Sequence, residues 1–458
     1  MRFCSTAGRD RDSLCGMSKT FRPWNVDEVW LLPPSVQDFV PAKHAAHFIR
    51  ETVRTQLDLR SIFASYDEER GYPPYHPTMM VALLLYGYSR GVYSSRQLER
   101  ACEERVDFMA VTGMSRPDFR TVAEFRRRHL AALGGLFVQV LKLCREAGLV
   151  KLGHVALDGT KIKANASKHK AMSYGRMHEA EAKLRAEVQA WFARAEAADA
   201  EEDRAHGTER GDELPDWVAD KQQRLERLSA AKAALEAEAK TPPAPDDDRP
   251  GPSTGMVDHG KPKRAPDGGP PPRAQRNFTD PDSRIQKTRD GMVQGYNAQI
   301  AVDGAHQIIL AQHVQTNPAD RGALVPLVKA IRRDLKANPD ELSADAGYCD
   351  EANLAFLAKR RIPAYLAPGR TRHADGDPTG KRRVRKRSRV AAMATKLRRA
   401  GRRSRYRLRK QIVEPVFGQI KAARGFRQFF LRGFGKVRQE WAIICTVHNL
   451  LKLAAAQR

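Results

Sequence analysis

The feature that most constrains the fold is a β-hairpin pattern at residues 295–316. Two runs of β-prone residues, GYNAQIAV and HQIILAQHV, flank the dipeptide Asp303-Gly304. Asp-Gly between two such runs is the strongest short-range signal for an antiparallel hairpin. This part of the chain therefore predicts β-structure.

Strands and helices alternate around this hairpin. Residues 155–157 predict a short buried strand that ends at Asp158, and ELSADAGYCD predicts another that ends at Asp345. Helices are predicted in DRGALVPLVKAIRRDL, in EANLAFLAKRR and across residues 405–424, with a further strand in IPAYLAP. The order is three strands followed by helix, strand, helix, strand and helix. It predicts an α/β fold in which helices flank a mixed sheet, and it is also the order of the ribonuclease H-like fold.

Residues 41–150 are predicted to form a helical N-terminal domain. HPTMMVALLLYGYSRG is apolar enough to be a core helix, and Ser94 with Gln97 predicts a capping box at the start of the next one. A third helix, RPDFRTVAEFRRRHL, carries Arg126 and Arg127 near its end. Short helices with a basic last one fit a unit that binds DNA ends, and they fit a packing domain with a solvated basic face equally well.

An insertion at residues 165–285 is predicted to interrupt the α/β domain, which spans residues 151–455. Two Ala- and Glu-rich segments inside it have helical periodicity, and Leu225, Leu228 and Leu235 lie near heptad spacing. These segments predict a helical hairpin. The tract that follows is rich in Pro and Gly and is predicted to be disordered.

The charge of the chain favours a polyanionic partner. Lys and Arg outnumber Asp and Glu by 80 to 54, which gives a net charge of +26 and a pI near 10.0. Nucleic acid is the commonest partner of so basic a chain; the alternative is a charge excess that serves solubility. The six cysteines have no paired spacing, which argues against a zinc module and a disulfide framework. No apolar run approaches the ~18 residues that cross a bilayer, so a cytoplasmic location is expected.

A second loop is predicted at residues 369–405, and its latter half is strongly basic. Residues 381–410 include 16 Lys or Arg and no acid. Such a run is commonly solvated. In this chain it favours contacts with DNA phosphates, with Arg382 and Arg383 among the contacting residues.

Three acidic residues are the candidates for catalysis. Asp158 and Asp345 are predicted at strand ends next to tight turns, where α/β folds place their chemistry. Glu414 precedes Pro415 in the last predicted helix, at a point where the backbone is irregular. Converging carboxylates repel one another, and Mg²⁺ relieves this repulsion; two such ions can hold both oxygens of a phosphoryl transfer. The simpler alternative is that Asp158 and Asp345 only cap turns.

Several motifs resemble bacterial insertion-sequence transposases of the DDE type. They are ALDGTKIKANAS, GYNAQIAVD, SADAGYCD and the segment from VEPVFGQIKAARGF to TVHNLLKL, and the N-terminal helices resemble the same family. The likeness covers about residues 18–165 and 277–455. It implies a ribonuclease H-like core in which Asp158, Asp345 and Glu414 bind metal, with Mg²⁺ as the cofactor and Mn²⁺ able to replace it.

Many members of the family carry a Tyr-Arg-Glu-Lys signature around the glutamate. Lys421 fits its spacing, whereas Tyr406 and Arg409 fit only with one extra residue before Glu414. Lys410 and Arg407 stand at the strict Arg and Tyr positions. The residues assigned to DNA are Tyr406, Arg409, Lys410 and Lys421.

These features together predict a DNA transposase. It would nick the ends of its own element by hydrolysis and then join the freed 3′-hydroxyls to target DNA. Its partners would be the terminal inverted repeats and target duplex, bound by a homodimer or higher multimer at the bacterial nucleoid. One alternative is a ribonuclease H-like nuclease or resolvase without strand transfer. The other is a decayed transposase that still binds DNA.

Residues 1–40 are predicted to form an N-terminal extension. Residues 1–16 match nothing in the family, so translation is expected to start at Met17.

Overall fold

The computed structural model describes residues 35–66, 74–167, 170–206, 216–240, 269–288, 291–368, 388–400 and 405–457. Met17, the Pro- and Gly-rich tract before residue 269, and Arg382 and Arg383 lie outside these residues, so the predictions made for them stay predictions.

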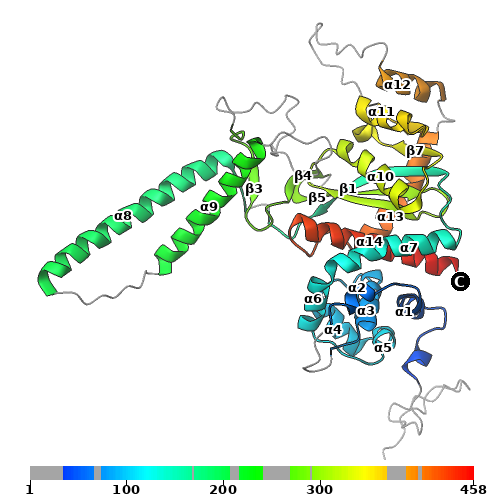
Figure 1. Cartoon of the computed structure of the whole chain (residues 1–458), viewed down its shortest axis with the longest axis horizontal. Helices are drawn as coiled ribbons and strands as arrows, with labels where there is room; N and C mark the ends of the chain where they lie inside the picture. The colour runs from blue at the N-terminus through cyan, green and yellow to red at the C-terminus, as the bar shows by residue number, and fades with distance from the viewer. Residues whose placement is uncertain are drawn as a thin grey trace, which may run out of the picture.

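A mixed sheet forms the centre of the molecule (Figure 1). The long strand β1 (His154–Lys163) lies in its middle, antiparallel to β5 (Gly291–Asp303) and parallel to β7 (Glu341–Ala344). Beyond β7 lies β8 (Ala364–Leu366), which is also parallel. β6 (Ile309–Gln315) and β4 (Arg284–Thr288) both pair with β5 in the antiparallel sense. The order β6-β5-β1-β7-β8 confirms the predicted ribonuclease H-like sheet.

The predicted hairpin is present as β5 and β6, joined by residues 304–308. The loop is longer than a two-residue Asp-Gly turn, and the carboxylate of Asp303 binds backbone N–H groups within the loop and before β1. Its Oδ1 accepts from the N–H of Ala305 at 2.8 Å, and its Oδ2 accepts from those of Lys151 and Leu152 at 2.9 and 2.7 Å. Asp303 therefore joins the hairpin to the chain that enters β1.

Helices cover both faces of the sheet. α10 (Leu324–Leu335) and α11 (Glu351–Lys359) lie on one side, and α14 (Phe434–Ala456) lies on the other with α7 (Leu130–Glu146) beside it (Figure 1). Asn449 on α14 fixes this packing, because its side chain accepts from the N–H of Ile309 and donates to the carbonyl of Ile309, both at 2.9 Å.

The N-terminal helices share one continuous hydrophobic core with the sheet domain. They are η1 (Val36–Phe39), α1 (Ala45–Thr55), α2 (Arg60–Phe63), α3 (Pro77–Ser89), α4 (Ser95–Glu104), α5 (Val106–Thr112) and α6 (Phe119–Arg128). α3 is buried on nearly all sides, as its apolar sequence predicts. Ser94 is the N-cap of α4, but its side chain makes no capping hydrogen bond, so the predicted capping box is wrong.

The predicted insertion contains two long helices, α8 (Tyr174–His206) and α9 (Asp216–Lys240), which project from the sheet domain (Figure 1). At their base β2 (Ala171–Ser173) pairs with β3 (Gln275–Asn277). The helices pack around a separate small core of Met177, Leu184, Leu228, Leu235 and Ala274. This core is separate from the main one, and the helical pair is joined to the sheet by Glu238 of α9, which pairs with the buried Arg284 of β4 at 3.3 Å.

Removal of the helical pair is therefore expected to leave the sheet domain folded. Ser173 faces Gln275 in the β2–β3 pair, so an Asn-Gly turn in place of residues 174–274 would close the two strands directly. The shortened chain also carries Arg284→Met, because the deletion removes Glu238, the ion-pair partner of the buried Arg284. We expect soluble protein whose melting temperature lies within about 5 °C of that of the full chain, a shift equivalent to roughly 1–2 kcal/mol. Thermal unfolding, monitored by circular dichroism, measures the melting temperature. Loss of all soluble protein would show that the pair supports the main core.

Two predicted boundaries differ from the structure. β1 does not end at Asp158 but continues to Lys163, because every residue from Val155 to Lys163 pairs with β5. Within the predicted loop 369–405, α12 (Arg389–Ala400) is a helix that buries Met393 and packs against α11. Both differences arise from tertiary contacts, which override local turn and charge signals.

Candidate active site

Two of the predicted acidic residues lie side by side on neighbouring parallel strands. The β1–β7 ladder pairs Ala156 with Ser343, and Asp158 and Asp345 each follow two residues later. Asp345 comes directly after β7 and caps a 3-10 turn, its Oδ1 accepting from the N–H of Gly347 at 2.9 Å. Parallel register thus brings the two carboxylates to the same level of the sheet.

Both carboxylates are in surroundings that disfavour negative charge. Burial raises the pKa of Asp158 to about 6; Arg409 and the N–H of Gly159 oppose the rise, and Asp345 and Asp320 add to it. Burial also raises the pKa of Asp345, and the carboxylate of Asp320 is the next cause. The two carboxylates together therefore favour the binding of a cation close to them.

Arg409 supplies one such cation. It lies on α13 (Leu408–Gly418), and its Nη1 donates to Oδ2 of Asp158 at 2.5 Å. Its guanidinium also lies 5.8 Å from the ring centroid of Tyr406, while its buried Nε has no hydrogen-bond partner among the described residues. The structure thus places Arg409 at Asp158 and Tyr406 against Arg409, although the spacing of both residues departs from the family signature.

Glu414 lies on the same helix, with its side chain exposed. α13 passes through Pro415 without a break. Proline leaves the carbonyl of Gln411 without its helical donor, and the side-chain amide of Gln307 donates to it at 3.3 Å. Among the described residues no three His, Cys, Asp or Glu side chains gather closely enough to hold a metal ion. The structure therefore brings Asp158 and Asp345 together but does not bring Glu414 to them.

The last signature residue lies close to β1. Lys421 is in a π-helical turn (Gln419–Ala423) that continues α13, and its Nζ donates to the carbonyl of Lys161 at 2.9 Å. Lys410, at the strict Arg position, points to solvent. Lys421 is thus a second cation on the side of the sheet from which Arg409 reaches Asp158.

The basic residues of α6 have different surroundings. The guanidinium of Arg126 donates to the carbonyl of Tyr93 at 2.8 Å and to the hydroxyls of Tyr88 and Ser95 at 3.2 and 3.1 Å. Arg127 is exposed and pairs with Glu124. Arg126 therefore joins α6 to the helices beside it, and Arg127 is the one of the two on the surface.

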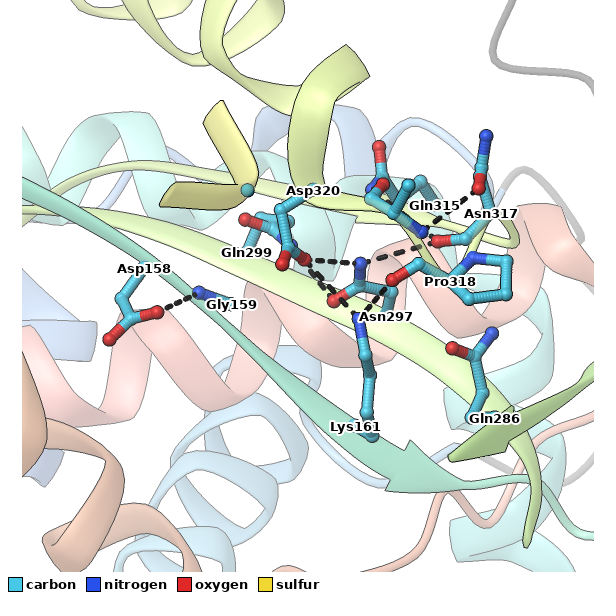
Figure 2. A network of polar contacts seen from close by, with 12 residues as sticks. Asp158, Gly159, Lys161, Gln286, Asn297, Gln299, Gln315, Asn317, Pro318 and Asp320 are labelled. Carbon is cyan, nitrogen blue, oxygen red and sulfur yellow. Dashed lines mark hydrogen bonds and ion pairs between the residues drawn. The ribbon is translucent and has the colours of Figure 1, made fainter. Parts of the chain in front are cut away.

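Sequence reasoning missed a polar network beside the carboxylates (Figure 2). Asp320 lies at its centre, and its Oδ1 accepts from Lys161 on β1 at 3.2 Å and from Asn297 and Gln299 on β5, each at 2.7 Å. Gln299 also accepts from the hydroxyl of Tyr348. The available signal was the pair Asn297 and Gln299, which are amides at buried positions of an otherwise apolar strand.

A second polar set fixes the register of β1 against β7. Nδ1 of His154 lies 2.7 Å from Oε1 of Glu341, and its Nε2 lies 2.8 Å from Oγ of Ser343. Arg405, next to α13, also pairs with Glu341. The order serine, histidine, acid is that of a hydrolase triad, but Ser343 is fully buried and no substrate can reach it.

Replacing His154 with Ala is expected to destabilise the fold. Glu341 and Ser343 would both lose a hydrogen-bond partner in a buried setting, which costs about 1–3 kcal/mol. Urea unfolding measures the loss, with His306→Ala in the exposed hairpin loop as the control. Equal stability of the two variants would contradict a role for His154 in strand register.

None of the helices within the described ranges is long and apolar enough to cross a membrane.

The sheet order and the paired carboxylates define an α/β protein of the ribonuclease H-like class. Residues 34–128 match the family described as Transposase domain (DUF772), and residues 267–450 match the Transposase DDE domain. The chain belongs to the DDE transposases of insertion sequences. No curated protein and no solved structure matches it. The DDE match includes Asp345 and Glu414 and begins at residue 267, within the insertion, so Asp158 is assigned to the site by its position beside Asp345.

Membership of this family implies nuclease and transposition activity, binding to DNA, and use of divalent metal ions.

Proposed function

We propose that this transposase cleaves the ends of its own element and joins the 3′-hydroxyls to target DNA at a site centred on Asp158 and Asp345. The observation that supports this most is the placement of two partly buried carboxylates at one level of the neighbouring parallel strands β1 and β7. Carboxylates that burial and mutual repulsion destabilise are typical of metal-dependent phosphoryl-transfer sites. The net charge of +26 supports a polyanionic substrate.

The two aspartates fit a divalent metal. Mg²⁺ binds proteins through one or two carboxylates, keeps several waters and takes further oxygens from substrate phosphate. Asp158 and Asp345 provide the carboxylates, and the positive charge would offset the repulsion that raises both pKa values. When bound, Mg²⁺ or Mn²⁺ would stabilise the negative charge that develops on the phosphate, and two ions are expected.

The protein side chains would position the DNA. Arg409 and Lys421 approach β1 from the segment of α13 and the π-helical turn, so both can bind phosphate oxygens next to Asp158. Tyr406, whose ring lies against the Arg409 guanidinium, would stack on an unpaired end base. A contribution from Glu414 requires that bound metal and DNA draw its side chain toward the aspartates. Because transposition joins two ends, at least two copies of the chain would act together on DNA.

The test is a strand-transfer assay with the DNA that flanks the gene. Short imperfect inverted repeats near both ends of the reading frame would supply the duplexes. The expected result is metal-dependent nicking followed by covalent joining of the 3′-hydroxyl to a second duplex. Nicking without joining would support a nuclease or resolvase, and binding without nicking would support a decayed transposase.

A further inference from the structure

Asp320 and Lys161 lie next to the candidate site, and neither belongs to the predicted metal-binding triad. Asp320 opens a 3-10 turn (Asp320–Ala323) that leads into α10, and Lys161 follows Asp158 by three residues on β1 (Figure 2). Their side chains are 23% and 19% exposed, so the pair borders the site and is not sealed in the core. The pair is therefore in contact with solvent, as a group that binds DNA must be.

The loop that carries Asp320 is held from two strands. The side-chain amide of Gln315 donates to the carbonyl of Ala319 at 2.5 Å, and that of Asn297 donates to the carbonyl of Asn317 at 3.2 Å. Asn317 also caps the loop, its Oδ1 accepting from the N–H of Ala319 at 2.9 Å. These bonds fix Asp320 before any substrate arrives, and such preorganisation is what a positioning group requires.

Asp320 also lies close to Asp345. A Cβ at Gly347 would lie 3.0 Å from Oδ2 of Asp320 and 3.1 Å from Oδ1 of Asp345. Both carboxylates therefore approach the same point, and a side chain at position 347 would press against both. Gly347 permits this approach, and it brings Asp320 and Lys161 into the electrostatic field of the aspartate pair.

Lys161 has an ammonium hydrogen available for a ligand. Its Nζ donates to the carbonyl of Pro318 at 2.6 Å and to Oδ1 of Asp320 at 3.2 Å, and it makes no other hydrogen bond with a described residue. An ammonium group has three N–H donors. The two acceptors set the position of Nζ, and the third donor remains for an oxygen that enters the site.

We propose that Asp320 is a positioning residue that holds the Lys161 ammonium close to Asp345, where Lys161 binds a phosphate oxygen of DNA. This inference rests on the proposed function, because it assumes that DNA enters at the aspartate pair. Lys161 would reach the phosphate from the β5 side of β1, whereas Arg409 reaches Asp158 from α13. The two cations would thus hold the backbone from different directions.

The test measures the salt dependence of binding to a random-sequence duplex in the presence of Ca²⁺. Each lost phosphate contact flattens the slope of log affinity against log salt by about 0.9. Lys161→Met keeps most of the side-chain length and should flatten the slope by that amount. Asp320→Asn should flatten it similarly, because Lys161 loses its anchor. A slope unchanged from wild type in Lys161→Met overturns the phosphate contact.

Asp320→Asn also separates positioning from bulk charge. Removal of a negative charge alone would tighten DNA binding, whereas loss of positioning would weaken it. Asp58→Asn is the matched control, since Asp58 pairs with Arg60 on the surface and the substitution makes the same charge change. Asp320→Asn binding as tightly as Asp58→Asn overturns the positioning role. Asp320→Glu keeps the charge but moves the carboxylate, so it should flatten the slope too. If Asp320→Asn does not fold, Asp320→Glu tests the positioning role in its place.

Cleavage of the flanking-DNA duplex is measured in parallel. We expect Lys161→Met and Asp320→Asn to cut about 10²-fold more slowly at saturating DNA, the effect of losing one preorganised donor to a developing charge. A wild-type rate in Lys161→Met would overturn its role at the reacting phosphate. Absence of cleavage by the wild-type chain would instead contradict the proposed function, and the salt slopes would still report on Lys161.

Discussion

Asp158→Asn and Asp345→Asn are each expected to reduce metal-dependent cleavage more than about 100-fold while leaving binding to duplex DNA largely intact. Loss of a group that only supports a metal ligand costs ~10–100-fold in metal affinity or activity, so loss of a ligand should cost more. DNA binding should survive because neither aspartate donates to phosphate. Cleavage assays and gel-shift titrations on the same preparations measure the two effects.

Asp58→Asn is the control for this pair, since it removes a surface carboxylate far from the site in sequence and should cut at the wild-type rate. More than a few per cent of wild-type activity in either variant would remove that aspartate from the metal site. Thermal unfolding checks that a loss of activity does not come from a loss of fold.

Glu414→Gln carries a separate prediction, because the structure leaves Glu414 exposed and away from the aspartate pair. If Glu414 completes the triad when DNA and metal are bound, the variant should lose cleavage to the same extent as the aspartate variants. Cleavage at the wild-type rate would leave the site with two aspartates, with Asp320 as a further carboxylate that acts electrostatically on both.

The fold was predictable because its signals are local. The Asp303-Gly304 hairpin, the helical pattern of α10 and the apolar run of α3 each depend on residues close together in the chain, and all three features are present. The extent of β1 was not predictable from such signals. Gly159 suggests a turn, yet it lies within the strand and pairs with Gln299 of β5. The position is a glycine because the Gln299 side chain occupies the space that a Cβ at position 159 would need.

The site was predictable only in part, for the same reason. Asp158 and Asp345 each end an apolar run, which sequence shows, and the parallel ladder then brings them together. Asp320 follows Asn-Pro-Ala and resembles an ordinary loop residue. Its importance arises from Lys161, which is 159 positions away in the chain, and from Asn297 and Gln299 on another strand. Only the sheet brings these side chains to one place.

Arg409→Gln is expected to strengthen binding of Mn²⁺ in the absence of DNA, by about tenfold. Arg409 occupies Oδ2 of Asp158, so a metal ion must displace the guanidinium or bind without that oxygen. Gln carries no charge, so Asp158 and Asp345 would lose their nearest neutralising partner and favour a divalent cation more strongly. Calorimetric titration with Mn²⁺ measures the affinity, and Lys410→Gln, which removes an exposed cation from the same helix, is the matched control.

The same variant should change how stability depends on pH. The pKa of Asp158 in the folded chain is raised to about 6, above its ordinary value of 3.8, so the folded state binds this proton more tightly than the unfolded state. Its contribution to stability is therefore present at low pH and is lost as the pH rises through this interval. Without Arg409 the folded pKa rises further, and the loss continues above pH 6. Arg409→Gln should then be close to wild type in stability at pH 5 and less stable at pH 8. A constant difference across this range, with unchanged Mn²⁺ affinity, would show that the ion pair does not control the charge of Asp158.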